Sequence, residues 1–156
     1  MLRLDKILVP TDFSDFSRPA LDYGCELAAR FESELHLLNA IQDPMVYAPE
    51  PVMVGTEAAE RYMQEQRDAA EQALAKLPGG DRELGRPIAR EVRLGTAFVE
   101  ILRYAKEVQV DLIVIGTHGR TGLKHVLLGS VAERVVRMAP CPVLTVRPSG
   151  HQFVMP

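Results

Sequence analysis

Cysteine is scarce in this chain, and its spacing excludes several classes of protein. The two cysteines, Cys25 and Cys141, lie far apart and form no C-x-x-C pair, so the sequence indicates neither a disulfide framework nor a zinc site. A free cysteine behaves as a small hydrophobic residue, and we expect both thiols to be buried. Histidine is nearly as sparse and shows no H-E-x-x-H or comparable ligand spacing. We therefore predict no structural metal.

Long hydrophobic runs are also missing. No stretch approaches the ~20 uninterrupted apolar residues that a membrane span needs. Asp5 and Lys6 fall where a secretory signal would have its apolar core, and no small-residue cleavage site follows. We therefore expect a cytoplasmic protein that does not contact a membrane.

An excess of positive charge is absent as well. The formal net charge is -3 at pH 7, which argues against a general binder of nucleic-acid polymers. The charge is unevenly distributed, because the segment from Gly116 onward contains several basic residues but a single acidic one, Glu133. With 156 residues, of which 47% are hydrophobic and 25% charged, the chain fits one folded domain. We predict that this domain spans residues 1–148 and that residues 149–156 form a flexible tail.

Strand and helix patterns alternate along the chain. Short apolar runs predict five strands, at residues 6–10, 34–41, 88–95, 110–116 and 141–148. Apolar residues at helical spacing predict four helices between them, at about 18–31, 57–77, 96–108 and 130–139. The long segment 42–56, rich in proline, is expected to be a loop.

Residues at the helix ends refine this prediction. Ser17 is favoured over Ser14 as the first cap, because Pro19 then lies in the first turn. Thr96 and Ser130 are the expected caps of the third and fourth helices. In the second helix, the tyrosine and methionine of "YMQEQ" are expected to pack against the rest of the protein.

The β-α-β alternation predicts a doubly wound α/β fold, with a five-stranded parallel sheet in the order 3-2-1-4-5 and helices on both faces. The run 110–116 is the most continuous aliphatic segment, and we expect it to be the central strand. The run 88–95 alternates apolar and charged residues, which indicates an edge strand with one face in water. Ligands bind such sheets where the winding reverses, here between the first and fourth strands.

A glycine pattern follows the fourth strand: Gly116-x2-Gly119-x9-Gly129-Ser130. Glycine lets main-chain N–H groups turn toward an anion, and Gly129 with Ser130 begins a helix whose N-terminus attracts phosphate. The pattern is neither the P-loop G-x4-G-K-[ST] nor G-x-G-x-x-G. Because Asp12 ends the neighbouring strand, the two features predict a phosphate-binding crevice.

The segments "KILVPTDFS", "LLNAI", "DLIVIGTHGRTGLKHVLLGSVAERVV" and "CPVLTVRP" together resemble the universal stress protein family, from Lys6 to Pro148. The glycine spacing is the signature of its ATP-binding branch. The resemblance implies a Rossmann-like fold and a site for ATP, ADP or AMP, possibly with Mg²⁺. The implied nucleotide-binding residues are Pro10, Thr11, Asp12, Ala40, Ile115, Gly116, His118, Gly119, Arg120, Gly129, Ser130 and Val131.

Within this set the resemblance assigns parts of the ligand. Asp12 and the Ala40 backbone would face the adenine and ribose, Ile115 and Gly116 would border the nucleoside, and Gly119 and Gly129 to Val131 would contact phosphate. One departure is Ala40, where a larger aliphatic residue is common in the family.

Simpler interpretations remain open for several of these residues. Asp12 could cap the turn before the first helix, and Ser130 could cap the fourth helix with or without a phosphate. His118 is more typical of a packed loop residue than of a catalyst. Arg120 and Lys124 would either point into solvent or screen a triphosphate.

Three functions are compatible with the sequence. The first is a nucleotide-binding stress-response or signalling module with at most slow ATP hydrolysis, because we find no Walker lysine, no acidic pair for Mg²⁺ and no oriented base. The second is a nucleotide-free homodimer that pairs through its last strand, Val143 to Arg147, and acts on protein partners that the sequence does not identify. The third, an adenylating or nucleotide-hydrolysing enzyme, lacks a recognisable catalytic motif. The intact glycine series favours the first.

Overall fold

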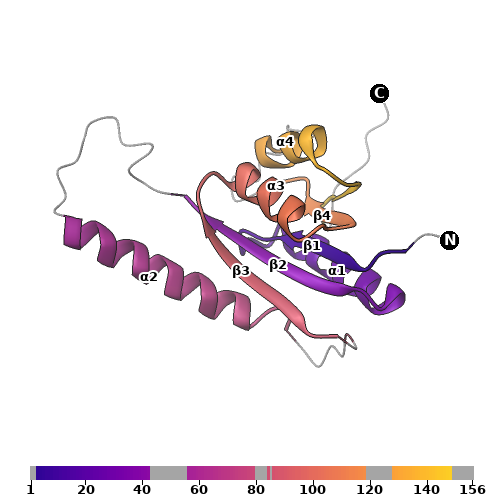
Figure 1. The fold of residues 1–156 in the computed structure, drawn as a ribbon, viewed down its shortest axis with the longest axis horizontal. Helices are drawn as coiled ribbons and strands as arrows, with labels where there is room; N and C mark the ends of the chain where they lie inside the picture. Colours follow the sequence, from indigo (N-terminus) through magenta and orange to yellow (C-terminus); the bar gives the residue numbers. More distant parts are fainter. Residues whose placement is uncertain (1–2, 43–55, 80–83, 85, 119–127, 149–156) are drawn as a thin grey trace.

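A computed structural model describes residues 3–42, 56–79, 84, 86–118 and 128–148. Its five strands form one parallel sheet in the order β3-β2-β1-β4-β5 (Figure 1), which confirms the predicted topology. The strands are β1 (Lys6–Pro10), β2 (Glu34–Ile41), β3 (Ile88–Leu94), β4 (Leu112–Gly116) and β5 (Val143–Val146). The helices are α1 (Arg18–Phe31), α2 (Thr56–Ala75), α3 (Ala97–Glu107) and α4 (Ser130–Met138).

The two faces of the sheet carry separate hydrophobic layers. Helices α1 and α2 cover one face, where Ile7 and Val9 of β1 are fully buried. Helices α3 and α4 cover the other face, where Leu8 of β1 and Ile113 of β4 are fully buried. Neighbouring residues of one strand enter opposite layers because side chains alternate across a sheet. The carboxyl ends of β1, β2 and β4 are therefore held by packing on both sides.

Local sequence explains where α1 and α3 begin. Ser17 is the N-cap of α1 and a proline lies in its first turn, while Thr96 is the N-cap of α3. Neither residue makes a side-chain capping bond. The Ser17 hydroxyl instead donates to the Ser14 carbonyl oxygen at 2.8 Å, which fixes the turn between β1 and α1.

Four expectations about single elements are corrected by the structure. The N-cap of α4 is Gly129, and Ser130 is the first residue of that helix. The central strand is β1, whereas β4 lies between β1 and β5. Cys25 is buried as expected, but Cys141 is only partly buried. The charged face of the edge strand β3 is partly covered by α3 and is not open to water along its length.

Candidate functional site

A cavity of about 690 Å³ opens at the carboxyl ends of the central strands. Residues of β1, β2, β4, α2, α3 and α4 line it, so it occupies the switch point where ligands bind in doubly wound sheets. Its size falls within the range of small-molecule sites. Every predicted site residue that the structure describes lies in the lining: Pro10, Thr11, Asp12, Ala40, Ile115, Gly116, His118, Gly129, Ser130 and Val131. Gly119 and Arg120 lie outside the described residues.

The end of β1 is fixed by hydrogen bonds around Thr11 and Asp12. The Thr11 amide donates to the Leu38 carbonyl oxygen at 2.9 Å, and the Asn39 side-chain amide donates to the Thr11 carbonyl oxygen at 2.8 Å. Oδ1 of Asp12 accepts from the amide and the hydroxyl of Ser14, at 3.0 and 2.6 Å. Asp12 therefore does organise the turn, as the simpler interpretation holds, and this turn fixes its carboxylate at the cavity.

The second wall is made where β4 ends and α4 begins. A Cβ at Gly116 would lie 3.0 Å from the Phe16 carbonyl oxygen, so a larger residue would push two backbones apart. The Gly129 amide donates to the Thr117 carbonyl oxygen at 2.6 Å, which joins the N-terminus of α4 to the end of β4. The first turn of a helix leaves amide hydrogens unpaired and carries partial positive charge. The cavity thus has an electropositive end beside Ser130.

One wall of the cavity was not predicted from the sequence. Helix α2 contributes Tyr62 and Gln66, followed along the same face by alanines at 69, 70 and 73. Tyr62 was expected to pack against the protein, yet it is 47% exposed. The signal was present in the four-residue spacing from Tyr62 to Gln66, which places both on one helix face. A spacing alone cannot tell whether that face meets a core or a cavity.

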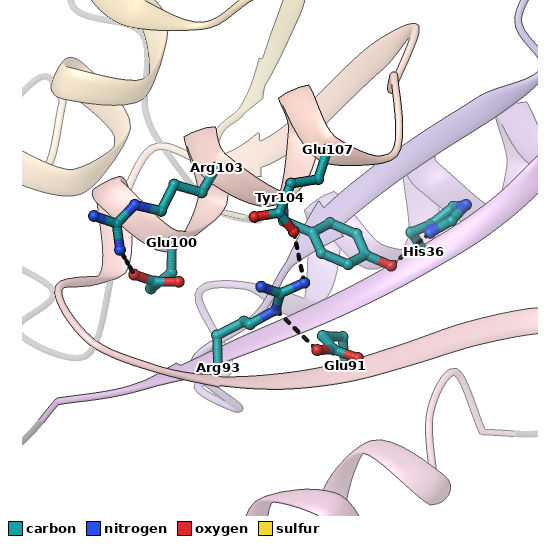
Figure 2. Close-up of polar contacts among 7 residues, drawn as sticks. All are labelled: His36, Glu91, Arg93, Glu100, Arg103, Tyr104 and Glu107. Carbon is teal, nitrogen blue, oxygen red and sulfur yellow. Dashed lines mark hydrogen bonds and ion pairs between the residues drawn. The ribbon is translucent and has the colours of Figure 1, made fainter.

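A second polar cluster lies between α3 and the strands β2 and β3, apart from the cavity lining (Figure 2). Nδ1 of His36 lies 2.8 Å from the Tyr104 hydroxyl oxygen. The guanidinium of Arg93 lies over the Tyr104 ring and pairs with Glu91 and Glu107, at 2.8 and 2.9 Å. Burial lowers the pKa of His36 and raises the pKa of Tyr104. These residues connect α3 to the sheet.

The described part of the chain contains no cluster of three or more His, Cys, Asp or Glu side chains with the geometry to hold a metal ion. None of its helices combines the length and apolar character needed to cross a membrane.

The fold and the position of the cavity define a doubly wound α/β domain with a ligand-sized site at its switch point. The model of the universal stress protein family matches residues 3–147. Universal stress protein MJ0531 from Methanocaldococcus jannaschii is 37% identical over 142 residues, which cover 91% of this chain and 81% of that protein. The chain belongs to the universal stress protein family.

Solved structures support the same assignment. Universal stress protein UspA from Lactobacillus plantarum has a TM-score of 0.74 and 28% identity, and the match covers 94% of this chain and 100% of that one. A universal stress protein solved in complex with cAMP has a TM-score of 0.59 and 27% identity, and covers 95% of this chain and 100% of that chain. At least one structural relative therefore binds a nucleotide.

Proposed function

We propose that this protein binds an adenine nucleotide, ATP foremost, and works as a nucleotide-dependent stress-response or signalling module. The observation that carries the proposal is a single cavity that joins Asp12, at the end of β1, to the N-terminus of α4. A carboxylate suits the hydroxyl and amino groups of a nucleoside, and a helix N-terminus suits phosphate. The relative that binds cAMP supports the same ligand class.

We expect ATP to be held rather than turned over quickly. Among the described lining residues there is no lysine or arginine, and Asp12 is the single carboxylate. His118 is the one imidazole there, and its Nδ1 lies 2.9 Å from the Thr117 hydroxyl oxygen. Rapid phosphoryl transfer needs cations on the phosphates and a positioned base. A Mg²⁺ ion would therefore be carried mainly by phosphate oxygens and water, as is usual for this ion.

We further propose that the protein forms a homodimer through β5. Among the described residues this strand pairs with β4 alone, so its other edge carries backbone groups that no described strand pairs with. Leu144 of β5 is 37% exposed. A dimer without bound nucleotide is the alternative function, and the location of Asp12 at the cavity favours the nucleotide-binding form.

Calorimetry with ATP, combined with mass spectrometry of nucleotide released from the purified protein, tests the proposal. The informative variant is Asp12→Asn, which keeps an oxygen for the Ser14 turn but removes the charge. We expect roughly ten-fold weaker ATP binding, because hydrogen bonds to charged groups contribute about 1.5–3 kcal/mol. Asp15→Asn is the matched control, since Asp15 is an exposed carboxylate of the same turn outside the cavity lining. Wild-type protein that neither carries nor binds an adenine nucleotide would favour the nucleotide-free dimer.

A further inference from the structure

We propose that α2 forms the base-binding wall of the cavity: the Tyr62 ring lies against the face of the adenine, and the Gln66 amide bonds to its edge. This inference rests on the proposed function, because it names the part of the nucleotide that this wall receives. None of the described α2 residues in the lining is charged, so the wall suits an uncharged planar group.

The order of elements across the sheet fixes which end of a nucleotide would reach α2. Helix α4 begins beside the end of β4, whereas α2 packs on β2 and β3. Because β1 lies between β4 and β2, α4 and α2 contribute to the cavity lining from opposite sides of β1. The two helices also lie on opposite faces of the sheet (Figure 1). A nucleotide whose phosphates sit at the N-terminus of α4 therefore points its base past Asp12 and Ala40 toward α2.

Tyr62 has the properties of a stacking residue. The residue is 47% exposed although its helix face lines a cavity, and among the described residues its ring forms no ring pair or cation–π contact. An exposed aromatic face gains free energy when a base stacks on it. The alanines at 69, 70 and 73 continue the same face and leave space beside the ring. Nucleotide binding would thus cover the exposed tyrosine.

Gln66 lies one helical turn after Tyr62 and can read the edge of the base. A glutamine amide supplies one acceptor and two donor hydrogens. Adenine presents a donor and an acceptor side by side at N6 and N7, whereas guanine presents two acceptors at O6 and N7. The amide therefore pairs fully with adenine and only in part with guanine. The facing wall from α3 supplies Ala97 and Ile101, which have no polar side-chain atoms to distinguish the two bases.

Binding measurements on matched variants test the Tyr62 assignment. Tyr62→Ala is expected to weaken ATP binding roughly ten-fold, since base stacking contributes about 1–3 kcal/mol, while Tyr62→Phe keeps the ring and stays within about two-fold. Tyr23→Ala is the control, because Tyr23 is 56% exposed on α1 outside the lining. If wild-type protein binds ATP and Tyr62→Ala binds it equally well, this inference fails while the proposed function stands. If wild-type protein binds no ATP, the proposed function itself fails.

Selectivity tests Gln66 separately. Gln66→Ala is expected to reduce the preference for ATP over GTP by about five-fold, because the variant loses the hydrogen bonds between the Gln66 amide and the edge of the base. Gln64→Ala is the control, because its side chain bonds to Asp68 at 2.7 Å on the exposed side of α2. An unchanged ATP-to-GTP ratio in Gln66→Ala would remove the edge-reading role.

Nuclear Overhauser contacts locate the base directly. In the complex of wild-type protein with ATP, we expect contacts from the adenine H2 or H8 proton to the Tyr62 ring protons, and upfield shifts of those adenine protons. Contacts to Ala97 and Ile101 in their place would put the base on the α3 wall and overturn the inference, whatever the affinities show.

Discussion

At the scale of single residues, Gly24 sets how closely α1 approaches the central strand. A Cβ at this position would collide with Cγ2 of Val9, and Val9 is fully buried. Valine is stiff at χ1 and has little room to yield. The absence of a side chain at Gly24 therefore lets α1 pack on β1, whose carboxyl end carries Asp12 to the cavity.

Gly24→Ala is expected to destabilise the protein although alanine favours a helix. Overpacking a core costs about 1–3 kcal/mol, which exceeds the gain of about 1 kcal/mol from helix propensity. Urea unfolding should give a net loss of up to about 2 kcal/mol. In a Val9→Ala background the collision disappears, so the same substitution should be neutral or stabilising. An equal loss in both backgrounds would show that Val9 is not the obstacle.

The role of a residue could be predicted from the sequence where that residue belongs to a recognisable motif. It could not be predicted where tertiary packing decides the role. Asp12 comes shortly after β1 and Gly129 directly precedes α4, and both line the cavity. Tyr62 lies in a helix whose pattern is the same whether it covers a core or a cavity. Ser130 was assigned as a cap because serine is preferred there, but glycine is also accepted at that position, and the helix begins one residue earlier than a cap at Ser130 would require.

At the scale of elements, a buried histidine joins α3 to β2. His36 is 4% exposed, and a carboxylate oxygen of Glu34 lies 3.4 Å from its Nε2. That nitrogen makes no hydrogen bond to a described residue, so we regard the contact with Glu34 as electrostatic only. The nearby carboxylate favours the tautomer protonated at Nε2, and Nδ1 then accepts a hydrogen bond from the Tyr104 hydroxyl. This arrangement needs a neutral ring.

Stability is therefore expected to fall as the pH drops through about 6.5, the usual pKa of histidine. Burial lowers the pKa of His36, and Lys6 lowers it further, whereas Glu34 opposes the shift. Below that pH the unfolded chain takes up a proton that the folded chain resists, so the free energy of unfolding decreases. Urea titrations between pH 7.5 and 5.5 measure this slope.

The double variant His36→Leu/Tyr104→Phe provides the control. Replacing both partners leaves no buried donor or acceptor without a partner, so the cost at pH 7.5 should be small. Tyr104→Phe alone leaves His36 Nδ1 without its partner and should cost about 1–3 kcal/mol. If the double variant keeps the full slope between pH 7.5 and 5.5, the proton uptake belongs to groups other than His36.

Element order was predictable from the sequence because the alternation of strand and helix patterns admits few parallel topologies. The polar cluster was not predictable. The alternating charges of 88–94 indicated an edge strand, and β3 does lie at the edge, but only the packing of α3 reveals that Arg93 meets Tyr104 there.

At the scale of the whole molecule, the open edge of β5 decides whether two copies can join. The Pro142 and Val146 carbonyl oxygens accept hydrogen bonds from Ile113 and Thr117, at 3.0 and 2.9 Å. Backbone groups alternate sides along a strand, so Val143 and Thr145 turn theirs toward the open edge. A second copy related by a two-fold axis would place its own β5 against this edge.

If the proposed homodimer forms through β5, Thr145→Pro is expected to convert it into a monomer. Proline removes the outward N–H, while the bonds to β4 come from the alternate residues and remain. Thr145→Ala keeps that donor and should stay dimeric in light scattering at the same protein concentration. Because the cavity lies on the other side of β4 from this edge, both variants should bind ATP with unchanged affinity. A Thr145→Pro protein that remains dimeric would place the interface elsewhere, and one that is monomeric but no longer binds ATP would show that the cavity depends on the partner copy.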